Sequence, residues 1–408
     1  MNWESVTLDK LGSVSRGRSK HRPRNDAILF GGKYPFIQTA DVKAAPFYIT
    51  EYNETYNDKG LAQSKLWHKG TLCITIAANI ADTAILDIDA CFPDSVMGFI
   101  PYDDVSDVRF VKYAFDMLQR DMKQISQGAA QDNLSWQKLS TIRFPNPPIE
   151  IQRKIADYLV AYEDLIENNQ KQIKLLEEAA QRLYKEWFVD LRFPGYENVK
   201  VVDGVPEGWK QCLLGDINCS LESGSRPKGG IDASLVDGVP SIGAENVIGL
   251  GCYNYSSEKL ITKEFFSKMK RGKLCDKDIL IYKDGAYIGR TSLFQDGFPH
   301  LEAAVNEHVF LLHAADEHIQ YYLFFTLYQQ EYYQKMQKLN KNAAQPGINS
   351  KAMMSLPVLL PTEDILDRFD SFAMPLMHKI FNISKQNRQL ELARDRLLPK
   401  LMSGELEV

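Results

Sequence analysis

The sequence has few cysteines and no long apolar run, and both shortages limit what the protein can be. Six cysteines are spread over 408 residues, and no two are spaced Cys-x-x-Cys. This pattern indicates reduced thiols and favours neither a disulfide framework nor a zinc site. No apolar stretch approaches the roughly 18 residues that a transmembrane helix needs. The polar, acidic start MNWESVTLDK is not typical of a signal peptide, so we expect a cytoplasmic protein without membrane contact.

The chain also lacks an excess of positive charge. Its formal net charge is −5, which argues against the basic coat of a protein that binds DNA non-specifically. Local basic stretches are present nevertheless. Residues 15–24, SRGRSKHRPR, carry five arginines and lysines and no acid, and residues 268–273, KMKRGK, form a second, shorter stretch. These two segments are candidates for contact with an anionic partner.

Motifs for catalysis are scarce as well. The sequence NPPI at 146–149 is similar to the Asn-Pro-Pro-aromatic motif of adenine methyltransferases, but Ile149 stands where those enzymes stack an aromatic ring on the flipped base. A proline-rich start of a helix is the simpler interpretation. Asp94, with Asp121 and Lys123, is similar to the carboxylate and lysine set of metal-dependent nucleases. However, Asp121 and Lys123 fall in a stretch with a helical pattern, where that set is not expected.

Metal and cofactor sites are not indicated either. His308, His313 and His318 follow one another at five-residue steps, which places them on neither one helix face nor one strand face. There is no glycine-rich phosphate loop that ends in Lys-Ser or Lys-Thr, and no nucleophile with a matching base. We therefore expect no catalytic residue, no metal and no cofactor in this chain, which would bind and position while the chemistry takes place elsewhere.

What the sequence does contain is an internal repeat. Trp3 and Trp209 open similar segments, and the spacing between matching positions grows from 206 residues there to 214 near the end of each copy. A proline-rich break follows each copy. The matching stretches are YPFIQTADV (34–42) with VPSIGAENV (239–247), GTLCITIAANIADTAIL (70–86) with DILIYKDGAYIGRTSLF (278–294), and GAAQ (128–131) with NAAQ (342–345).

After each break the pattern becomes helical, with apolar residues at steps of three and four. The first seam includes Leu165 and Ile173, with polar Asn169 between them, and the second includes Ile380, Ile383 and polar Asn387. Such narrow seams suit two helices that bury their stripes against each other. The alternative is that each helix packs only on its own globular domain. Pro375 lies inside the second seam, which predicts a kink or a later helix start.

The segments before each helix combine short β-rich runs, such as TLCITIA, DILIYKD and HVFLLH, with short helical pieces and Gly, Pro and Asn turns. We predict an α+β fold, with two similar domains joined by two long helices that pack together. The predicted boundaries are a first domain at 1–147, a first helix at 148–190, a linker at 191–208, a second domain at 209–360, and a second helix with the C-terminal tail at 361–408.

Four stretches resemble the specificity subunits of type I restriction–modification systems, and together they span the chain. They are the ending LLPKLMSGELEV (397–408), the helix start PPIEIQRKIADYL (147–159), the repeated Gly/Asn-x-x-Gln phrase before each break, and the linker at 187–210. The resemblance implies two target-recognition domains joined by an antiparallel coiled coil. It also implies a subunit without catalytic activity, which binds a split, asymmetric site on double-stranded DNA.

The partners implied by the resemblance are two methyltransferase subunits, which methylate adenine with S-adenosylmethionine, and restriction subunits in the full complex. Two alternatives remain at this stage. The chain could be a DNA methyltransferase or nuclease in its own right, or an adaptor whose two domains bind proteins rather than DNA.

Polar loop residues are the candidate DNA contacts, although each could also be an ordinary solvated turn residue. Candidates for phosphates or guanines are Arg16, Arg18, Lys20, Arg22, Arg226 and Lys228. Candidates for base edges are Gln38, Thr39, Asp41, Glu245 and Asn246. Gln131 and Gln345, in the repeated phrase, could contact DNA or brace the junction between domain and helix.

Overall fold

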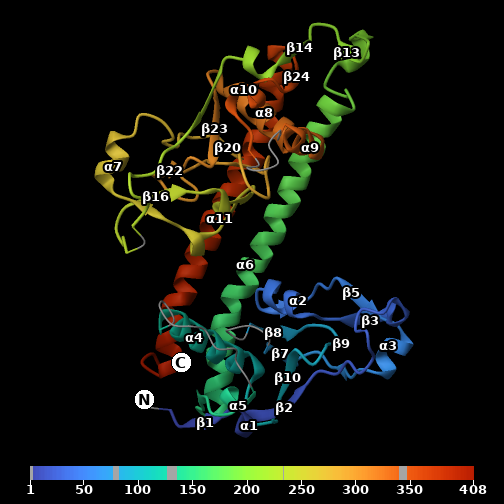
Figure 1. Cartoon of the computed structure of the whole chain (residues 1–408), viewed down its shortest axis with the longest axis vertical. Coiled ribbons are helices and arrows are strands. Elements are labelled where there is room, and N and C mark those ends of the chain that lie inside the picture. The colour runs from blue at the N-terminus through green and yellow to red at the C-terminus, as the bar shows by residue number, and fades with distance from the viewer. Residues whose placement is uncertain (1–2, 77–81, 126–135, 233, 340–346) are drawn as a thin grey trace. The chain divides into compact units, whose positions relative to one another are not determined.

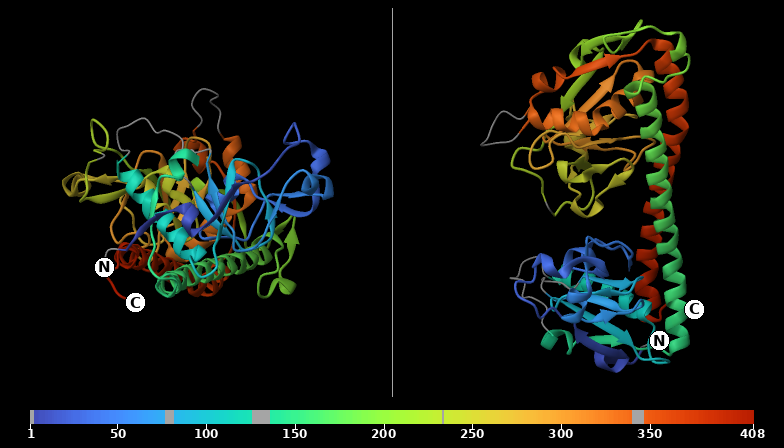
Figure 2. Two further views of the ribbon diagram at one scale, coloured as in Figure 1. Left: turned by 90° about the horizontal axis from the view of Figure 1, so that it is seen from below. Right: turned by 90° about the vertical axis from the view of Figure 1, so that its right-hand side faces the viewer.

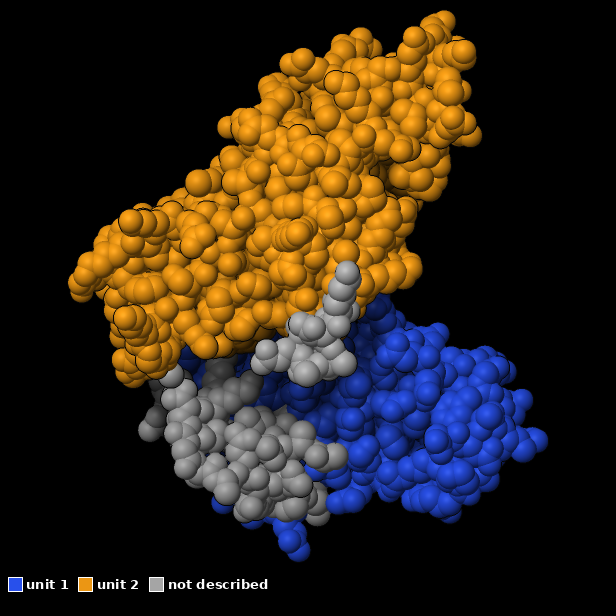
Figure 3. All heavy atoms as spheres, turned by 45° about the horizontal axis from the view of Figure 1, so that its top comes forward, with its two compact units in different colours: residues 1–166, 390–408 blue, residues 167–389 orange. Residues whose placement is uncertain are grey.

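The computed structural model describes residues 3–76, 82–125, 136–232, 234–339 and 347–408. The chain forms two compact units, shown in blue and orange in Figure 3. Unit 1 comprises residues 1–166 with 390–408, and unit 2 comprises residues 167–389. In the described part of the chain, no helix combines the length and apolarity needed to cross a bilayer.

Unit 1 contains a five-stranded sheet, a four-stranded sheet and a two-stranded pair. The strand orders are β2-β10-β7-β8-β4, β5-β3-β9-β6 and β1-β11. The strands are β1 (Ser5–Thr7), β2 (Gly12–Arg16), β3 (Phe30–Phe36), β4 (Tyr48–Ile49), β5 (Glu54–Tyr56), β6 (Leu66–Trp67), β7 (Leu72–Thr75), β8 (Thr83–Leu86), β9 (Ala90–Cys91), β10 (Val96–Pro101) and β11 (Arg143–Pro145). The helices are α1 (Leu8–Leu11), α2 (Thr39–Ala44), α3 (Asp58–Ala62), α4 (Val108–Ile125), α5 (Trp136–Leu139) and the 3-10 turn Ala27–Leu29.

Unit 2 contains a four-stranded sheet, a three-stranded sheet and three two-stranded pairs. The larger orders are β15-β23-β20-β21 and β19-β16-β22, and one pair is β14-β24. The strands are β12 (Val201–Val202), β13 (Val205–Pro206), β14 (Lys210–Leu213), β15 (Cys219–Ser223), β16 (Val239–Ile242), β17 (Val247–Gly249), β18 (Cys252–Tyr253), β19 (Leu260–Ile261), β20 (Ile279–Tyr282), β21 (Thr291–Leu293), β22 (Ala304–Val305), β23 (Val309–Ala314) and β24 (Pro357–Leu360). The shorter helices are α7 (Lys263–Lys268), α8 (Gln320–Tyr328), α9 (Gln330–Lys338), α10 (Ser350–Met354) and the 3-10 turn η5 (Ala244–Asn246).

The two domains have equivalent frameworks, as the repeat predicted. The order β2-β10-β7-β8 in unit 1 corresponds to β15-β23-β20-β21 in unit 2, and the parallel pair β3-β9 corresponds to β16-β22. Strand β7 in unit 1 and strand β20 in unit 2 are buried within these sheets, and each carries apolar side chains on both faces. Each domain also begins and ends in an antiparallel pair, β1 with β11 and β14 with β24. The first and last strands of each domain are therefore neighbours.

Two long helices, α6 (Ile149–Tyr184) and α11 (Glu363–Ser403), pack against each other within each unit (Figures 1 and 2). In unit 1, Leu159 of α6 shares a buried core with Leu398 of α11. In unit 2, Ile173 of α6 shares a core with Ile380 of α11. Residue numbers rise along one helix as they fall along the other, so the predicted antiparallel coiled coil and the α+β fold class are confirmed.

The buried seam differs in part from the predicted one. Leu165, which we placed in the seam, is 51% exposed, while Leu159 and Ile166 are buried. The seam residues follow seven-residue steps in two tracks, which is the repeat of a coiled coil. One track runs through the buried residues Leu159, Ile166, Ile173, Ala180 and Trp187, and the other contains buried Ile155 and half-buried Asn169 and Leu176. Our pattern followed apolar residue type, which did not distinguish the inner from the outer positions.

Of the two outcomes predicted for Pro375, a kink or a later helix start, the later start was wrong. Helix α11 begins at Glu363 and continues through Pro375. A proline inside a helix costs about 3 kcal/mol, because its nitrogen cannot donate and its ring crowds the preceding turn. Phe369, Ala373 and Met377 surround this position and are fully buried. Their burial offsets the cost of the proline, since each large apolar side chain contributes about 1.5–3 kcal/mol.

Candidate nucleic-acid interface

A close backbone contact positions the first loop in each domain. Gly17 follows strand β2, and a Cβ atom there would lie 2.3 Å from the carbonyl oxygen of Pro93. Gly224 follows the equivalent strand β15, and a Cβ atom there would lie 1.6 Å from the carbonyl oxygen of Val305. Only glycine fits at such distances. The loop that follows each glycine is thereby held beside the segment after β9 or β22.

In the first domain, this loop is built by hydrogen bonds from its backbone. The amides of Lys20 and His21 donate to Oε1 of Gln63, at 2.6 and 3.0 Å. The His21 side chain lies 2.8 Å from Asp26, and this hydrogen bond lowers the pKa of the Asp26 carboxyl. The loop has a defined shape although its side chains are mostly exposed.

The cations of this loop fall into three groups. Arg16, Arg18 and Lys20 are exposed, and their side chains form no hydrogen bond or ion pair with any described residue. Arg22 folds back instead, because its guanidinium donates to the carbonyl oxygens of Ser19 and His21. The remaining cation, Arg24, forms an ion pair with a carboxylate in the segment after β9.

This ion pair was missed by the sequence reasoning. Nη2 of Arg24 lies 2.6 Å from Oδ1 and 2.7 Å from Oδ2 of Asp94. In the sequence, Arg24 belongs to a basic stretch and Asp94 to a short pattern similar to that of nucleases, and no local pattern joins the two. The repeat could have pointed to this pair. If the alignment of the two copies is continued past β9 and β22, Asp94 and Glu307 fall at matching positions.

The equivalent loop of the second domain carries Arg226 and Lys228. Nε of Arg226 lies 2.8 Å from Oε1 of Glu307, and Lys228 is exposed. A pocket of about 300 Å³ opens here. Its lining residues are Arg226, Ile231, Glu245, Lys259, Asn306, Glu307 and His308.

The pocket contains charges of both signs. Partial burial raises the pKa of Glu245, but the hydrogen bond from Lys259, 2.8 Å away, a backbone hydrogen bond and the nearby charges of Lys259 and His308 together hold that pKa below its ordinary value. Nδ1 of His308 lies 3.0 Å from Asp284. The pocket therefore presents oriented donors and acceptors and carries little net charge, which suits contact with neutral groups such as base edges.

The structure gives two of the predicted base readers a different role. Asp41 and Asn246 occupy matching positions in the repeat, and both are buried. Asp41 accepts hydrogen bonds from the Gln38 amide and from the Asn53 side chain. Asn246 accepts from the Gly243 amide and donates to the Asn254 carbonyl. Their polar atoms brace the turn that follows β3 or β16, and this use argues against base contacts by either residue.

The remaining predicted residues lie at different depths. Gln38 is exposed and donates from Nε2 to Glu54 at 2.7 Å, and Thr39 is half-buried at the start of α2. Glu245 is exposed at the rim of the pocket described above. Gln131 and Gln345 lie outside the described residues.

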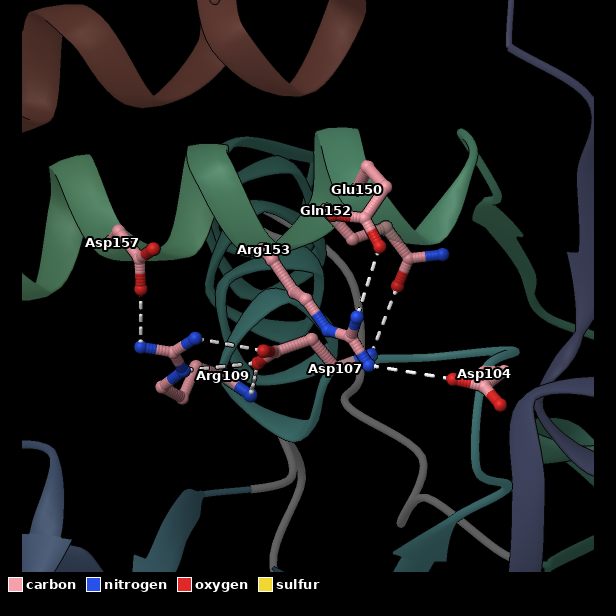
Figure 4. A network of polar contacts seen from close by, with 7 residues as sticks. All are labelled: Asp104, Asp107, Arg109, Glu150, Gln152, Arg153 and Asp157. Atoms are coloured by element: carbon pink, nitrogen blue, oxygen red, sulfur yellow. Dashed lines mark hydrogen bonds and ion pairs between the residues drawn. The ribbon is translucent and has the colours of Figure 1, made fainter.

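The motif NPPI proves to be a helix start. Asp107 and Arg109 of the first domain contact Gln152 and Asp157 of α6 (Figure 4). Beside them, Arg153 of α6 pairs with Glu150 of its own helix and with Asp104 of the first domain. The buried Gln152 amide donates to the carbonyl of Pro147, at 2.9 Å. Nη1 of Arg109 donates to Asp157 at 2.7 Å. The motif thus serves to join the first domain to its helix.

The three regularly spaced histidines do not converge. Each pairs with a separate carboxylate: His308 with Asp284, His313 with Asp278 and His318 with Asp367. Within the described ranges, no group of three or more metal-ligating side chains is assembled.

Comparison with known proteins identifies this architecture. The family model described as "Type I restriction modification DNA specificity domain" matches residues 1–178 and 206–383, one copy for each repeat. The chain belongs to the type I restriction–modification DNA specificity family. The resemblance seen in the sequence is thereby confirmed.

Individual members of the family match over nearly their full length. The MjaIX specificity subunit of Methanocaldococcus jannaschii is 27% identical and covers 100% of this chain and 94% of its own. The HindI specificity subunit of Haemophilus influenzae is 22% identical and covers 99% and 100%. The crystal structure of the S subunit from M. genitalium, 16% identical, superposes with a TM-score of 0.57 over 98% of this chain and 96% of that one.

These relatives are specificity subunits of restriction enzymes, and the family membership gives this chain the same part. It is a specificity subunit, which recognises DNA sequence and is not the catalytic component. The alternative of a methyltransferase or nuclease acting by itself gains no support from the relatives.

Proposed function

We propose that the two domains of this specificity subunit each recognise one part of a bipartite, asymmetric DNA site. An asymmetric site is supported by one contrast: the two domains share a framework of strands but differ in the exposed residues of their loops. Exposed Gln38 in the first domain matches Gly243 in the second, and the residues of the loop after Gly17 differ from those of the loop after Gly224. Domains that differ in their exposed polar groups would read different base sequences.

The paired helices provide the second part of the proposal. Two recognition domains in one chain make the second contact with DNA intramolecular, which raises overall affinity. The register of α6 and α11 is fixed by Asn169 with Asn387 and by Glu163 with Arg394. We propose that this fixed register determines the gap between the two parts of the site.

The partners follow from the proposed role. We propose that two methyltransferase subunits bind this chain and methylate adenine, and that restriction subunits complete the assembly. The chain itself would bind double-stranded DNA and no cofactor, since S-adenosylmethionine would be held by the methyltransferases. A cytoplasmic location, where the chromosome of a bacterium or archaeon lies, remains a prediction.

A footprint of the complex tests the proposal. The full chain, purified with the methyltransferase subunits of its own host, would be bound to DNA from that host. We expect two protected patches with an accessible gap and unlike sequences. A single patch, two identical patches or no sequence preference would contradict the proposal. Methylome sequencing of a host with and without the gene would give the recognised sequence directly.

The enzyme alternative has its own test. The purified chain would be incubated with DNA, Mg²⁺ and labelled S-adenosylmethionine, without any partner. We expect neither methyl transfer nor cleavage, and turnover by the chain alone would overturn the assignment.

A further inference from the structure

We propose that Arg24 with Asp94, and Arg226 with Glu307, are equivalent guanine-reading pairs, one in each recognition domain. The inference rests on the proposed function and adds to it the residues that read sequence. It also predicts that each part of the DNA site contains a G·C pair contacted by one of these arginines.

The two carboxylates occupy the same position in the fold. In the first domain, Phe36 of β3 pairs in parallel with Cys91 of β9, and Asp94 stands three residues after Cys91. In the second domain, Ser241 of β16 pairs in parallel with Ala304 of β22, and Glu307 stands three residues after Ala304. The match of 34–42 with 239–247 and the strand pairing together make Asp94 and Glu307 equivalent.

The two arginines reach this position from loops of different length. Arg24 stands seven residues after Gly17, whereas Arg226 stands two residues after Gly224. By sequence, Arg226 matches Arg22, because a proline follows each of them, yet Arg22 folds back onto its own loop. The contact is thus made by arginines that do not correspond in the repeat. Duplication alone does not explain such a coincidence, whereas a shared function does.

The two arginine–carboxylate ion pairs contribute little to the stability of the fold. The Arg24 and Arg226 side chains are 48% and 61% exposed. Ion pairs at such exposed sites typically contribute little, because water screens them and two long side chains must be ordered. The more substantial consequence is a fixed direction for each guanidinium group.

Each pair leaves a fork of N–H donors free. Asp94 accepts one hydrogen bond from Nη2 of Arg24, so that the second N–H of Nη2 and the donor beside it on the same edge of the guanidinium remain for another partner. Glu307 engages Nε of Arg226, so that Nη1 and Nη2 remain. Two donors from one guanidinium match the O6 and N7 acceptors of guanine in the major groove. A guanidinium already held in place loses less side-chain entropy when it binds.

The carboxylate also favours a base over a phosphate. It cancels much of the arginine's charge, which weakens attraction to an anion but leaves the direction of the N–H groups unchanged. The exposed cations without a carboxylate partner, such as Arg18 and Lys228, suit phosphates instead. The domains therefore divide their cations between base reading and backbone contact.

Sequence preference of the full complex tests this division. The chain would be purified with its methyltransferase subunits, and its preferred DNA sequence would be selected from a random library. We expect Arg24→Ala to relax one base position in one part of the site, and Arg226→Ala to relax one position in the other part. Discrimination at the affected position should fall about 10- to 100-fold, as for loss of a bidentate arginine–guanine contact.

Conservative variants separate orientation from charge. Arg24→Lys and Arg226→Lys keep the charge but lose the fork, so they should relax the same single position and keep non-specific affinity. Asp94→Asn and Glu307→Gln should relax that position less, and should raise affinity for non-specific DNA because a negative charge is removed. The lysine variants and circular dichroism spectra together exclude misfolding as the cause.

Lys228→Ala serves as the matched control. It should weaken binding about equally for all sequences and lower the salt dependence by about one counterion. If Arg226→Ala behaved like Lys228→Ala, or left the preferred sequence unchanged, the inference would be wrong while the proposed function would stand. If the unaltered complex showed no preference in either part, the proposed function itself would fail.

Discussion

Asn169 of α6 donates a hydrogen bond from Nδ2 to Oδ1 of Asn387 in α11, at 2.8 Å. Both side chains lie on the apolar seam, between Ile166 and Ile173 on one helix and between Ile380 and Arg394 on the other. A polar pair at one seam position is satisfied only when the helices pair in one register. The two asparagines therefore select the alignment of the coiled coil.

Leucine substitutions at these asparagines test this role. Asn169→Leu alone should destabilise the protein by about 1–2 kcal/mol, because Asn387 loses this hydrogen-bond partner in a buried place. The double substitution with Asn387→Leu should be neutral or stabilising, since both amides are replaced by apolar groups. Urea unfolding would measure both changes. Asn168→Leu, at an exposed position of the same helix, is the control and should change stability little.

The ion pair between Glu163 and Arg394 makes a second prediction. Nη1 of Arg394 lies 2.9 Å from Glu163, and the side chains of Arg394 and Glu163 are only 21% and 13% exposed. Arg394→Met should cost about 3 kcal/mol, because it leaves a carboxylate mostly buried without its cation. Lys171→Met, which removes an exposed partner of Glu167 on the same helix, should cost less than about 1 kcal/mol.

The pH dependence of the Arg394→Met variant provides an independent check. Burial raises the pKa of Glu163, and Arg394 opposes that rise. Without the arginine, the pKa should rise further, so the folded state should take up a proton more readily than the unfolded state. The stability deficit of the variant should therefore shrink as the pH is lowered from 7 toward 5. A deficit that stayed constant would indicate that Glu163 is not the group responsible.

Asp278 should produce a pH dependence of its own. Burial raises the pKa of this carboxyl to about 6, although Oδ2 accepts the Cys275 amide and Oδ1 lies 2.8 Å from His313. Because the folded pKa is raised, the stability contributed by this group is complete below about pH 4 and is lost as the pH rises through about 6. Asp278→Asn should remove this slope from unfolding curves measured between pH 4 and 7. The exposed residue Asp237 provides the control, since Asp237→Asn should leave the slope unchanged.

Gly224 should tolerate no side chain. A Cβ atom there would meet the Val305 carbonyl oxygen at 1.6 Å, so Gly224→Ala must move the backbone of the loop or of β22. We expect a loss of at least about 1–3 kcal/mol in thermal unfolding, as for overpacking, together with weaker DNA recognition by the second domain. At Gly347 the nearest atom would be 3.5 Å away, so Gly347→Ala should be tolerated. Equal effects of the two substitutions would contradict the close contact.

The repeat, the long helices and the short strands could be predicted because each leaves a local pattern. Strand β7 falls within TLCITIA and β20 within DILIYKD. Asn169 was recognisable as a polar residue within an apolar seam. The start of α11 was misjudged because the cost of Pro375 is local, whereas its neighbours on the helix are buried by residues distant in sequence.

The candidate site was predicted less well because it depends on neighbours in space. Asp41 and Asn246 have the side chains of base readers, but strand ends and turns use them internally. Arg24 and Asp94 are 70 residues apart, and tertiary contacts, such as the Arg18 amide donating to the Phe92 carbonyl, bring their segments together. Residue type alone did not distinguish Arg22, which folds back, from Arg24, which is held by a carboxylate.

The strand pairs β1-β11 and β14-β24 explain how the repeat tolerates unequal copies. Since each domain starts and finishes on adjacent strands, residues added at its far loops leave the attachment to the coiled coil unchanged. The eight extra residues that separate the spacing of 206 from that of 214 can therefore be accommodated without a shift in helix register. A lineage that carries this scaffold could change the DNA sequence that the two domains recognise, while the proposed binding site for methyltransferase subunits stayed the same.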